Sequence, residues 1–269
     1  MSPTKRALCV LVVLLAQVVF LFGSGIFMLG FGMDGILATI LWDVVACAAV
    51  AVWMRYGRTD GPVPYGRLSR PKGLGPGLTV LGAGSVMASV SMSMLMLFLE
   101  SRLRDPGMEM RAESVSAVGV GAYLFLSVAV APLAEELFYR VFTYGMLRRH
   151  VGVWPAAILS SFLFGGGHFT LGHLVTGGLF GMLMAMVYEY TGRWWASVFC
   201  HFVYNFSVIA VSMTGGLVSA AETVPGGTAS IAMSLALVGV GCAAVIRKER
   251  SHGLRGICVV PDRDEANHP

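Results

Sequence analysis

The amino-acid sequence predicts an all-α fold: a bundle of about eight transmembrane helices with both termini in the cytoplasm. Hydrophobic residues make up 56% of the 269 positions and charged residues 13%, against about 25% in soluble proteins. The mean hydropathy is +0.73, and the charges gather in short stretches between long apolar runs. This composition excludes a soluble enzyme, a disordered chain and a nucleic-acid-binding protein with a basic face.

Eight apolar stretches reach or approach the length of a spanning helix, which is about 20 residues. They cover about 7–32, 35–54, 77–98, 115–134, 155–172, 174–190, 194–213 and 229–246. The first stretch follows Lys5 and Arg6 as a signal peptide would, but it contains no small-residue cleavage site, so we expect a retained anchor. Residues 1–246 are therefore expected to form one transmembrane domain. The polar segment 247–269 is expected to be a disordered cytoplasmic tail.

The basic residues predict the orientation of the bundle. With eight spans, sixteen of the 19 Lys and Arg residues fall on the side of the two termini. Arg102, Arg104 and Arg111 are the three that fall on the other side. Because positively charged loops stay in the cytoplasm, this asymmetry predicts cytoplasmic termini, with the basic stretch 140–149 as one of the cytoplasmic loops.

Ionisable residues inside a membrane are energetically unfavourable, so they mark candidate functional sites. The candidates here are Asp43, Glu135, Glu136, His168, His173 and His201, together with the amide of Asn205. All but Asp43 lie between positions 135 and 205. We therefore expect four consecutive spans to carry the chemistry and the first three spans and the last to be scaffold. Asp43 is expected to face the bundle interior in a structural role.

Glu135 and Glu136 begin the sequence Glu-Glu-Leu-Phe-Tyr-Arg, which ends at Arg140. Adjacent helical residues point about 100° apart, so the two carboxylates cannot share one role. Glu136 and Arg140 are four residues apart with the acid first, which favours an ion pair. Glu135 has no such partner, and a desolvated, unpaired glutamate is suited to acid–base catalysis. The alternative is that both glutamates snorkel at a helix end, but Pro132 argues against it by opening backbone groups just ahead of the pair.

Two further motifs place polar side chains one helical turn apart. Phe164 and His168 flank three glycines, which permit close approach of another helix or of a substrate. His201 and Asn205 share a helix face, where they either bond helices together or donate to a developing oxyanion. His173 is about 140° round the helix from His168, so we expect it at the membrane interface and apart from the site.

These three motifs, in this order and each on its own span, resemble the CAAX prenyl endopeptidase and bacteriocin-processing (CPBP) family of intramembrane proteases, also called the Abi family. The resemblance covers about residues 115–210, so the catalytic core is expected at about 115–213. Two positions depart from the common family pattern: Tyr139, where many members have Phe, and Val141, where many have Gly.

The resemblance implies hydrolysis of a peptide bond by an activated water molecule. It implies that Glu135 and His168 hold and activate the water, and that His201 and Asn205 stabilise the oxyanion. The second glutamate and the arginine of the first motif, Glu136 and Arg140, would then be supporting residues.

The family is often described as metalloproteases, but the sequence leaves open whether this chain needs a metal ion. Zinc is a candidate, with Glu135, His168 and His201 as a three-ligand set and water in the fourth position. The chain contains no His-Glu-x-x-His sequence. A metal-free glutamate protease is favoured, because a buried Glu beside a His is enough to activate water.

The implied substrate is a membrane-embedded peptide or a lipidated C-terminus, met in the lipid bilayer of a bacterial cytoplasmic membrane. Two other functions also place polar residues inside a membrane. One is an ion-coupled transporter, against which the chain shows no internal repeat and gathers its polar residues in one half. The other is a non-catalytic bacteriocin-immunity or scaffold protein with the same fold, which the complete set of motifs disfavours.

The charge asymmetry yields a prediction about topology. Reporters fused after residues 65, 107, 220 and 260 should read inside, outside, outside and inside, because the basic loops stay in the cytoplasm. Paired alkaline phosphatase and fluorescent-protein fusions measure this. A reporter after residue 107 that reads cytoplasmic would contradict the eight-span arrangement.

Overall fold

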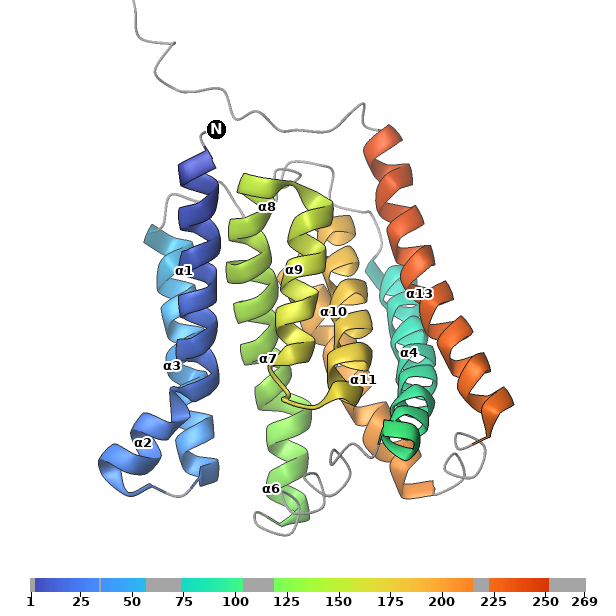
Figure 1. The fold of residues 1–269 in the computed structure, drawn as a ribbon, viewed down its shortest axis with the longest axis horizontal. Coiled ribbons are helices and arrows are strands. Elements are labelled where there is room, and N and C mark those ends of the chain that lie inside the picture. The colour runs from blue at the N-terminus through green and yellow to red at the C-terminus, as the bar shows by residue number, and fades with distance from the viewer. Residues whose placement is uncertain (1–2, 34, 57–73, 104–118, 215–222, 252–269) are drawn as a thin grey trace, which may run out of the picture.

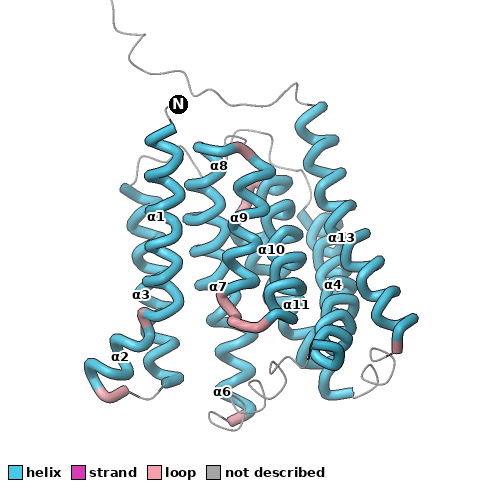
Figure 2. The backbone as a smooth tube through the Cα atoms, in the orientation of Figure 1, coloured by secondary structure: helices cyan, strands magenta, loops and turns pink. Residues whose placement is uncertain are grey.

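The chain folds as a bundle of helices. The computed structural model describes residues 3–33, 35–56, 74–103, 119–214 and 223–251. These residues form helices, with no strand among them (Figure 2). Seven of the described helices are long and apolar enough to cross a membrane. The predicted fold class, an all-α multi-pass integral membrane protein, is confirmed.

The helices follow one another along the chain, and two stretches between them have π-helical hydrogen bonding. The bounds are α1 Pro3–Phe22, α2 Ser24–Phe31, α3 Gly35–Tyr56, α4 Leu74–Leu103, α6 Val120–Phe125, η1 Leu126–Val130, α7 Ala131–Glu136, η2 Leu137–Tyr144, α8 Gly145–Val151, α9 Val153–Gly166, α10 Leu171–Thr191, α11 Trp194–Thr214 and α13 Val224–Ser251. The start of α1 and the end of α13 lie at the same end of the bundle (Figure 1). Helix α13 includes the first residues of the predicted tail, and the rest of that tail, 252–269, lies outside the described residues.

The span that carries the glutamates is longer than predicted. It runs from Val120 to Val151 through α6, η1, α7, η2 and α8, whereas we expected it to end near residue 134. The expectation of a loop at 140–149 is therefore wrong, because these residues are helical, Arg140 is fully buried and Arg148 is 8% exposed. Both arginines form ion pairs with buried glutamates, which allows a basic residue to lie inside an apolar bundle.

Helix α9 is shorter than the span predicted at 155–172. It has 14 residues and ends at Gly166, which at 1.5 Å per residue gives about 21 Å, less than the core of a bilayer. Gly167 and His168 form a turn, and Phe169 adopts the left-handed region at φ 59°. Helix α10 then returns beside α9, so the turn lies within the length of the bundle (Figure 1). His168 is thus in a turn and not inside a helix.

The predicted first span, 7–32, is divided at Gly23 into α1 and α2. The indole of Trp42 in α3 packs on this glycine, where a Cβ would come within 2.2 Å of the ring. The indole N–H of Trp42 also donates to the carbonyl oxygen of Phe20 at 2.8 Å. These contacts attach the end of α1 to α3.

Glycines allow α9 and α10 to pack backbone against backbone. A Cβ on Gly165 would lie 2.6 Å from the carbonyl oxygen of Leu174 and 2.7 Å from the nitrogen of Gly178. From the side of α10, a Cβ on Gly177 would lie 3.0 Å from the Cα of Gly165. The close helix approach predicted for the glycine run is confirmed at Gly165, and it fixes where the α9–α10 turn lies.

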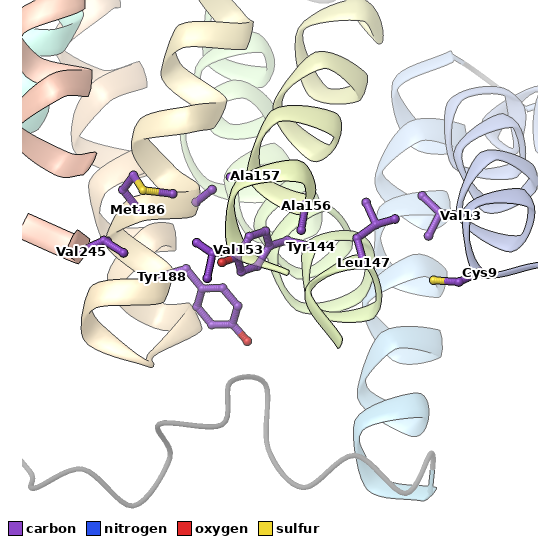
Figure 3. Packing of buried hydrophobic residues seen from close by; sticks show 11 residues of the cluster. Cys9, Val13, Tyr144, Leu147, Val153, Ala156, Ala157, Met186, Tyr188 and Val245 are labelled. Carbon is purple, nitrogen blue, oxygen red and sulfur yellow. The ribbon is translucent and has the colours of Figure 1, made fainter. Parts of the chain in front are cut away.

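The end of the bundle near α8 has its own core, to which α1, η2, α8, α9, α10 and α13 contribute (Figure 3). Val13, Tyr144 and Tyr188 are fully buried there. The hydroxyl of Tyr144 donates to Oε2 of Glu189 at 2.6 Å, and Arg148 forms an ion pair with Glu189 at 3.1 Å. Glu189 was not among the predicted candidates, although a glutamate at the end of an apolar span indicates a paired, buried charge.

Replacing Gly165 with Ala should destabilise the contact between α9 and α10, because the new methyl group would overlap two backbone atoms. We expect a loss of about 1–3 kcal/mol, measured as a lower Tm in detergent. Gly166→Ala is the matched control: its Cβ would meet only Cδ1 of Leu174, at 3.8 Å. That variant should keep or raise the Tm, because Ala favours helix more than Gly does. Equal losses in both variants would contradict the close packing.

Candidate active site

Glu136, the last residue of α7, is the centre of a buried polar network. Its Oε1 accepts a hydrogen bond from Nδ1 of His201 at 3.0 Å, and its Oε2 lies 3.1 Å from Nε of Arg140. Glu136 and Arg140 are fully buried, and His201 is 2% exposed. The predicted ion pair between Glu136 and Arg140 is confirmed. The contact with His201 adds a third partner from α11.

Glu135 points in a different direction from Glu136, as adjacent helical residues do. Its Oε2 lies 3.7 Å from Nε2 of the same His201 imidazole, and its side chain is 22% exposed. The two glutamates therefore flank one imidazole, with Glu136 at Nδ1 and Glu135 at Nε2. Because the Nδ1–H group donates to Glu136, the bond fixes the orientation of the ring and directs Nε2 toward Glu135.

The ring of Phe164, in α9, connects the three motifs. The guanidinium of Arg140 lies over its face, 4.9 Å from the ring centroid. The imidazoles of His201 and His168 meet the same ring edge to face, at centroid distances of 5.8 and 5.5 Å. Phe164 is 3% exposed, so its ring forms a buried wall of the site. The predicted proximity of Phe164 and His168 is confirmed.

His168 is held in the turn between α9 and α10. Its Nδ1–H group donates to the carbonyl oxygen of Phe164 at 3.1 Å. Its ring stacks on that of His173, with centroids 5.0 Å apart and planes 6° apart. Thr170 caps α10 and its hydroxyl lies 2.9 Å from Nδ1 of His173. The expectation that His173 lies apart from the site was wrong, because it assumed a continuous helix that the left-handed Phe169 interrupts.

Asn205, in α11, donates its side-chain amide to the carbonyl oxygen of Ser127 at 2.7 Å. That carbonyl belongs to η1, where the N–H of Ala131 bonds to the carbonyl of Leu126, five residues earlier. In the same pattern Ser127 would need an N–H at position 132, which Pro132 lacks. Asn205 therefore bonds a carbonyl that the proline leaves open, in agreement with the sequence argument about Pro132.

Helices α1 and α3, which were expected to be scaffold, pack against the helix that carries the glutamates. Asp43 of α3 is buried, as predicted, and α3 packs against α7, which carries the two glutamates. Gln17 of α1, which sequence analysis left out, donates from Nε2 to the hydroxyl of Tyr139 at 2.8 Å. These contacts hold the helices together, and the expectation that the first three spans are scaffold stays a prediction. The signal for Gln17 was a lone amide side chain inside the apolar run of α1, since such residues usually bond across helices.

The candidate zinc ligands are not gathered around one point. Among the residues that the structure describes, no three His, Cys, Asp or Glu side chains are placed to hold a single metal ion. Glu135 contacts His201, whereas the ring of His168 is bonded to Phe164 and stacked on His173. The three-ligand set of Glu135, His168 and His201 is thus not assembled here.

One buried and one partly exposed glutamate on the two sides of a histidine, inside a polytopic helical bundle, define a candidate intramembrane hydrolase. Residues 118–207 match the family described as type II CAAX prenyl endopeptidase Rce1-like. The matched range contains all three motifs. Both this match and the relative described next support the predicted CPBP family and, at the level of the family, a CAAX-type membrane protease.

The relative is a protein of Bacillus subtilis (strain 168) named "Putative membrane peptidase YdiL". It is 28% identical over 112 residues, which cover 40% of this chain and 46% of the relative. The match thus spans about half the length of that curated relative. No solved structure matches the chain significantly.

Glu136→Gln should destabilise the fold, because it leaves the buried guanidinium of Arg140 without its carboxylate. We expect a loss of about 3–5 kcal/mol, measured as a lower Tm and a lower folded yield in detergent. Replacing Glu136 with Gln and Arg140 with Met together should recover much of this loss, since no unpaired charge remains.

Glu135→Gln is the matched single variant, because its carboxylate is partly exposed and lies outside the ion pair. Its Tm in detergent should be close to that of the wild type. A Glu135→Gln variant that melts well below Glu136→Gln would contradict the assignment of Glu136 as the structural carboxylate.

Proposed function

We propose that the protein is an intramembrane endopeptidase of the CAAX type, which hydrolyses a peptide bond of a membrane-embedded or lipidated peptide. The observation that carries the proposal is the pair of glutamates at the two nitrogens of the buried His201 imidazole. This arrangement combines a carboxylate that can take a proton with an imidazole of fixed orientation. The family match supports the same class of reaction.

Glu135 is the proposed general base. It is the glutamate with partial exposure, whereas Glu136 has one oxygen on Arg140 and the other on His201. Glu135 takes a proton from water while the water oxygen attacks the carbonyl carbon of the peptide, which gives a tetrahedral oxyanion. The oxyanion then collapses, the C–N bond breaks, and Glu135 delivers the proton to the leaving amine.

His168 is the proposed partner of Glu135 in holding the water. Because Nδ1–H of His168 donates to the carbonyl of Phe164, its Nε2 is the accepting nitrogen in the neutral imidazole. The parallel stack on His173 further restricts the plane of the ring. A fixed acceptor of this kind is suited to orient a water molecule.

His201 and Asn205 are proposed to stabilise the oxyanion. Nδ1–H of His201 donates to Glu136, so Nε2 would donate to the oxyanion in the doubly protonated ring. The amide of Asn205 has two hydrogens, and its bond to Ser127 uses one of them. That bond also fixes the amide on the same face of α11 as His201, one turn away.

The substrate is proposed to be a peptide anchored in the bilayer. Glu135 and His201 belong to helices long and apolar enough to span a membrane, and His168 lies in a turn within the bundle. A lipid chain or a hydrophobic segment would hold a peptide at the depth where these residues lie. The family description, a prenyl endopeptidase, agrees with this class.

Cleavage of membrane-anchored peptides in liposomes tests the proposal. The wild type should release product, and Glu135→Gln should lower the rate by about 100-fold or more, because it keeps the size of the side chain and removes the base. The variant should still insert and bind the peptide. A chelator in the same assay should leave the wild-type rate unchanged if the mechanism is metal-free.

An assay of ion-coupled peptide uptake into the same liposomes distinguishes a transporter from a peptidase. Uptake without cleavage across a broad peptide library would contradict the peptidase proposal. A Glu135→Gln variant that cleaves at the wild-type rate would contradict the proposed base.

A further inference from the structure

We infer that Gln17 of α1 is a positioning residue for the active site. Through the hydroxyl of Tyr139 and the carbonyl of Leu163, it holds the turn that carries His168 against the helix that carries Glu135. This inference rests on the proposed function, in which His168 and Glu135 act on the same water molecule.

The amide of Gln17 joins three segments of the bundle. Its Nε2 donates to the hydroxyl oxygen of Tyr139 at 2.8 Å and to the carbonyl oxygen of Leu163 at 3.3 Å. An amide nitrogen has two hydrogens, so both are used. Tyr139 belongs to η2 and Leu163 to α9, so one side chain of α1 connects the first motif to the second. Gln17 is 6% exposed, which places the bridge inside the bundle.

Both partners of Gln17 touch the turn itself. The carbonyl of Leu163 also accepts a hydrogen bond from the N–H of Gly167 at 3.1 Å. The hydroxyl of Tyr139 lies against the same glycine, 3.0 Å from the position of a Cβ there. Gly167 immediately precedes His168, so a shift of either partner is passed on to the histidine.

The packing of Gly165 on α10 holds one side of the turn, and Gln17 supports another. The turn begins at Gly167, and glycine is the most flexible residue in the backbone. A displacement of about 1 Å in a catalytic group can lower a rate by about 100-fold. The Tyr139 ring adds a second support, because it meets the ring of Phe164 edge to face at a centroid distance of 5.1 Å.

The chain offers a variant set that separates positioning from stability. Gln17→Leu leaves the Tyr139 hydroxyl buried without its partner, and Tyr139→Phe leaves one Gln17 hydrogen without its acceptor. Each should lower the Tm, because a buried polar group without its partner is unfavourable. The double variant removes both polar groups of this pair and should recover Tm, while the carbonyl of Leu163 keeps its bond to Gly167.

The expected result is a separation of Tm from kcat. In Gln17→Leu and in the double variant, kcat should fall about tenfold or more with KM unchanged, because the bridge to Leu163 is lost in both. Tyr139→Phe keeps that bridge and should lose less activity. If kcat returned to the wild-type value together with Tm in the double variant, Gln17 would be a structural residue and the inference would be overturned.

Hydrogen exchange of the peptide 163–170 tests the same inference without a substrate. Its amides should exchange faster in Gln17→Leu and in the double variant than in the wild type. Val50→Ala is the control: Val50 of α3 is buried, but it packs with Leu137 and Val141 in a cluster that contains no residue of 163–170. It should lower Tm without changing exchange at 163–170. Unchanged exchange in Gln17→Leu overturns the inference, whereas a wild type that cleaves no peptide overturns the proposed function alone.

Discussion

Both oxygens of the Glu136 carboxylate are engaged inside the bundle, one beside Arg140 and the other with His201. A buried carboxylate without partners is strongly unfavourable, so this one charge requires η2 and α11 to be in place together. The guanidinium that completes the ion pair also lies over the ring of Phe164, which belongs to α9. The three motifs are thus arranged around a single negative charge, and Glu135 is left at its edge with partial exposure.

The π-helical segments explain how one helix presents so many groups to this site. A π turn contains an additional residue, so the segments η1 and η2 on either side of α7 shift the directions of the side chains and carbonyls that follow. At η1, the shift combines with Pro132 to leave the Ser127 carbonyl for Asn205. At η2, the side chains of Tyr139 and Arg140 point into the bundle, where both are buried. Pro132 and the two π-helical segments thereby allow one spanning helix to present several polar groups to the site.

Much of the fold and part of the site follow from local rules, and the rest depends on contacts between distant segments. The Glu136–Arg140 pair was predictable because both residues lie on one helix at a favourable spacing. The bond from His201 to Glu136 was not, because it joins positions 65 residues apart. Helix periodicity also misplaced His173, since one left-handed residue, Phe169, redirects the chain before it. Arg140 was placed in a loop because a sequence does not show that an arginine is buried beside its carboxylate partner.

The placement of Glu136 and Arg140 on a single helix bears on how the protein is made. The two charges compensate each other within about one helical turn, which lowers the cost of placing this pair in the bilayer before the other helices pack against it. His201 is synthesised 65 residues later and is not needed for that step. The ion pair can thus form within one helix, whereas the contact with His201 requires α11 to pack against that helix.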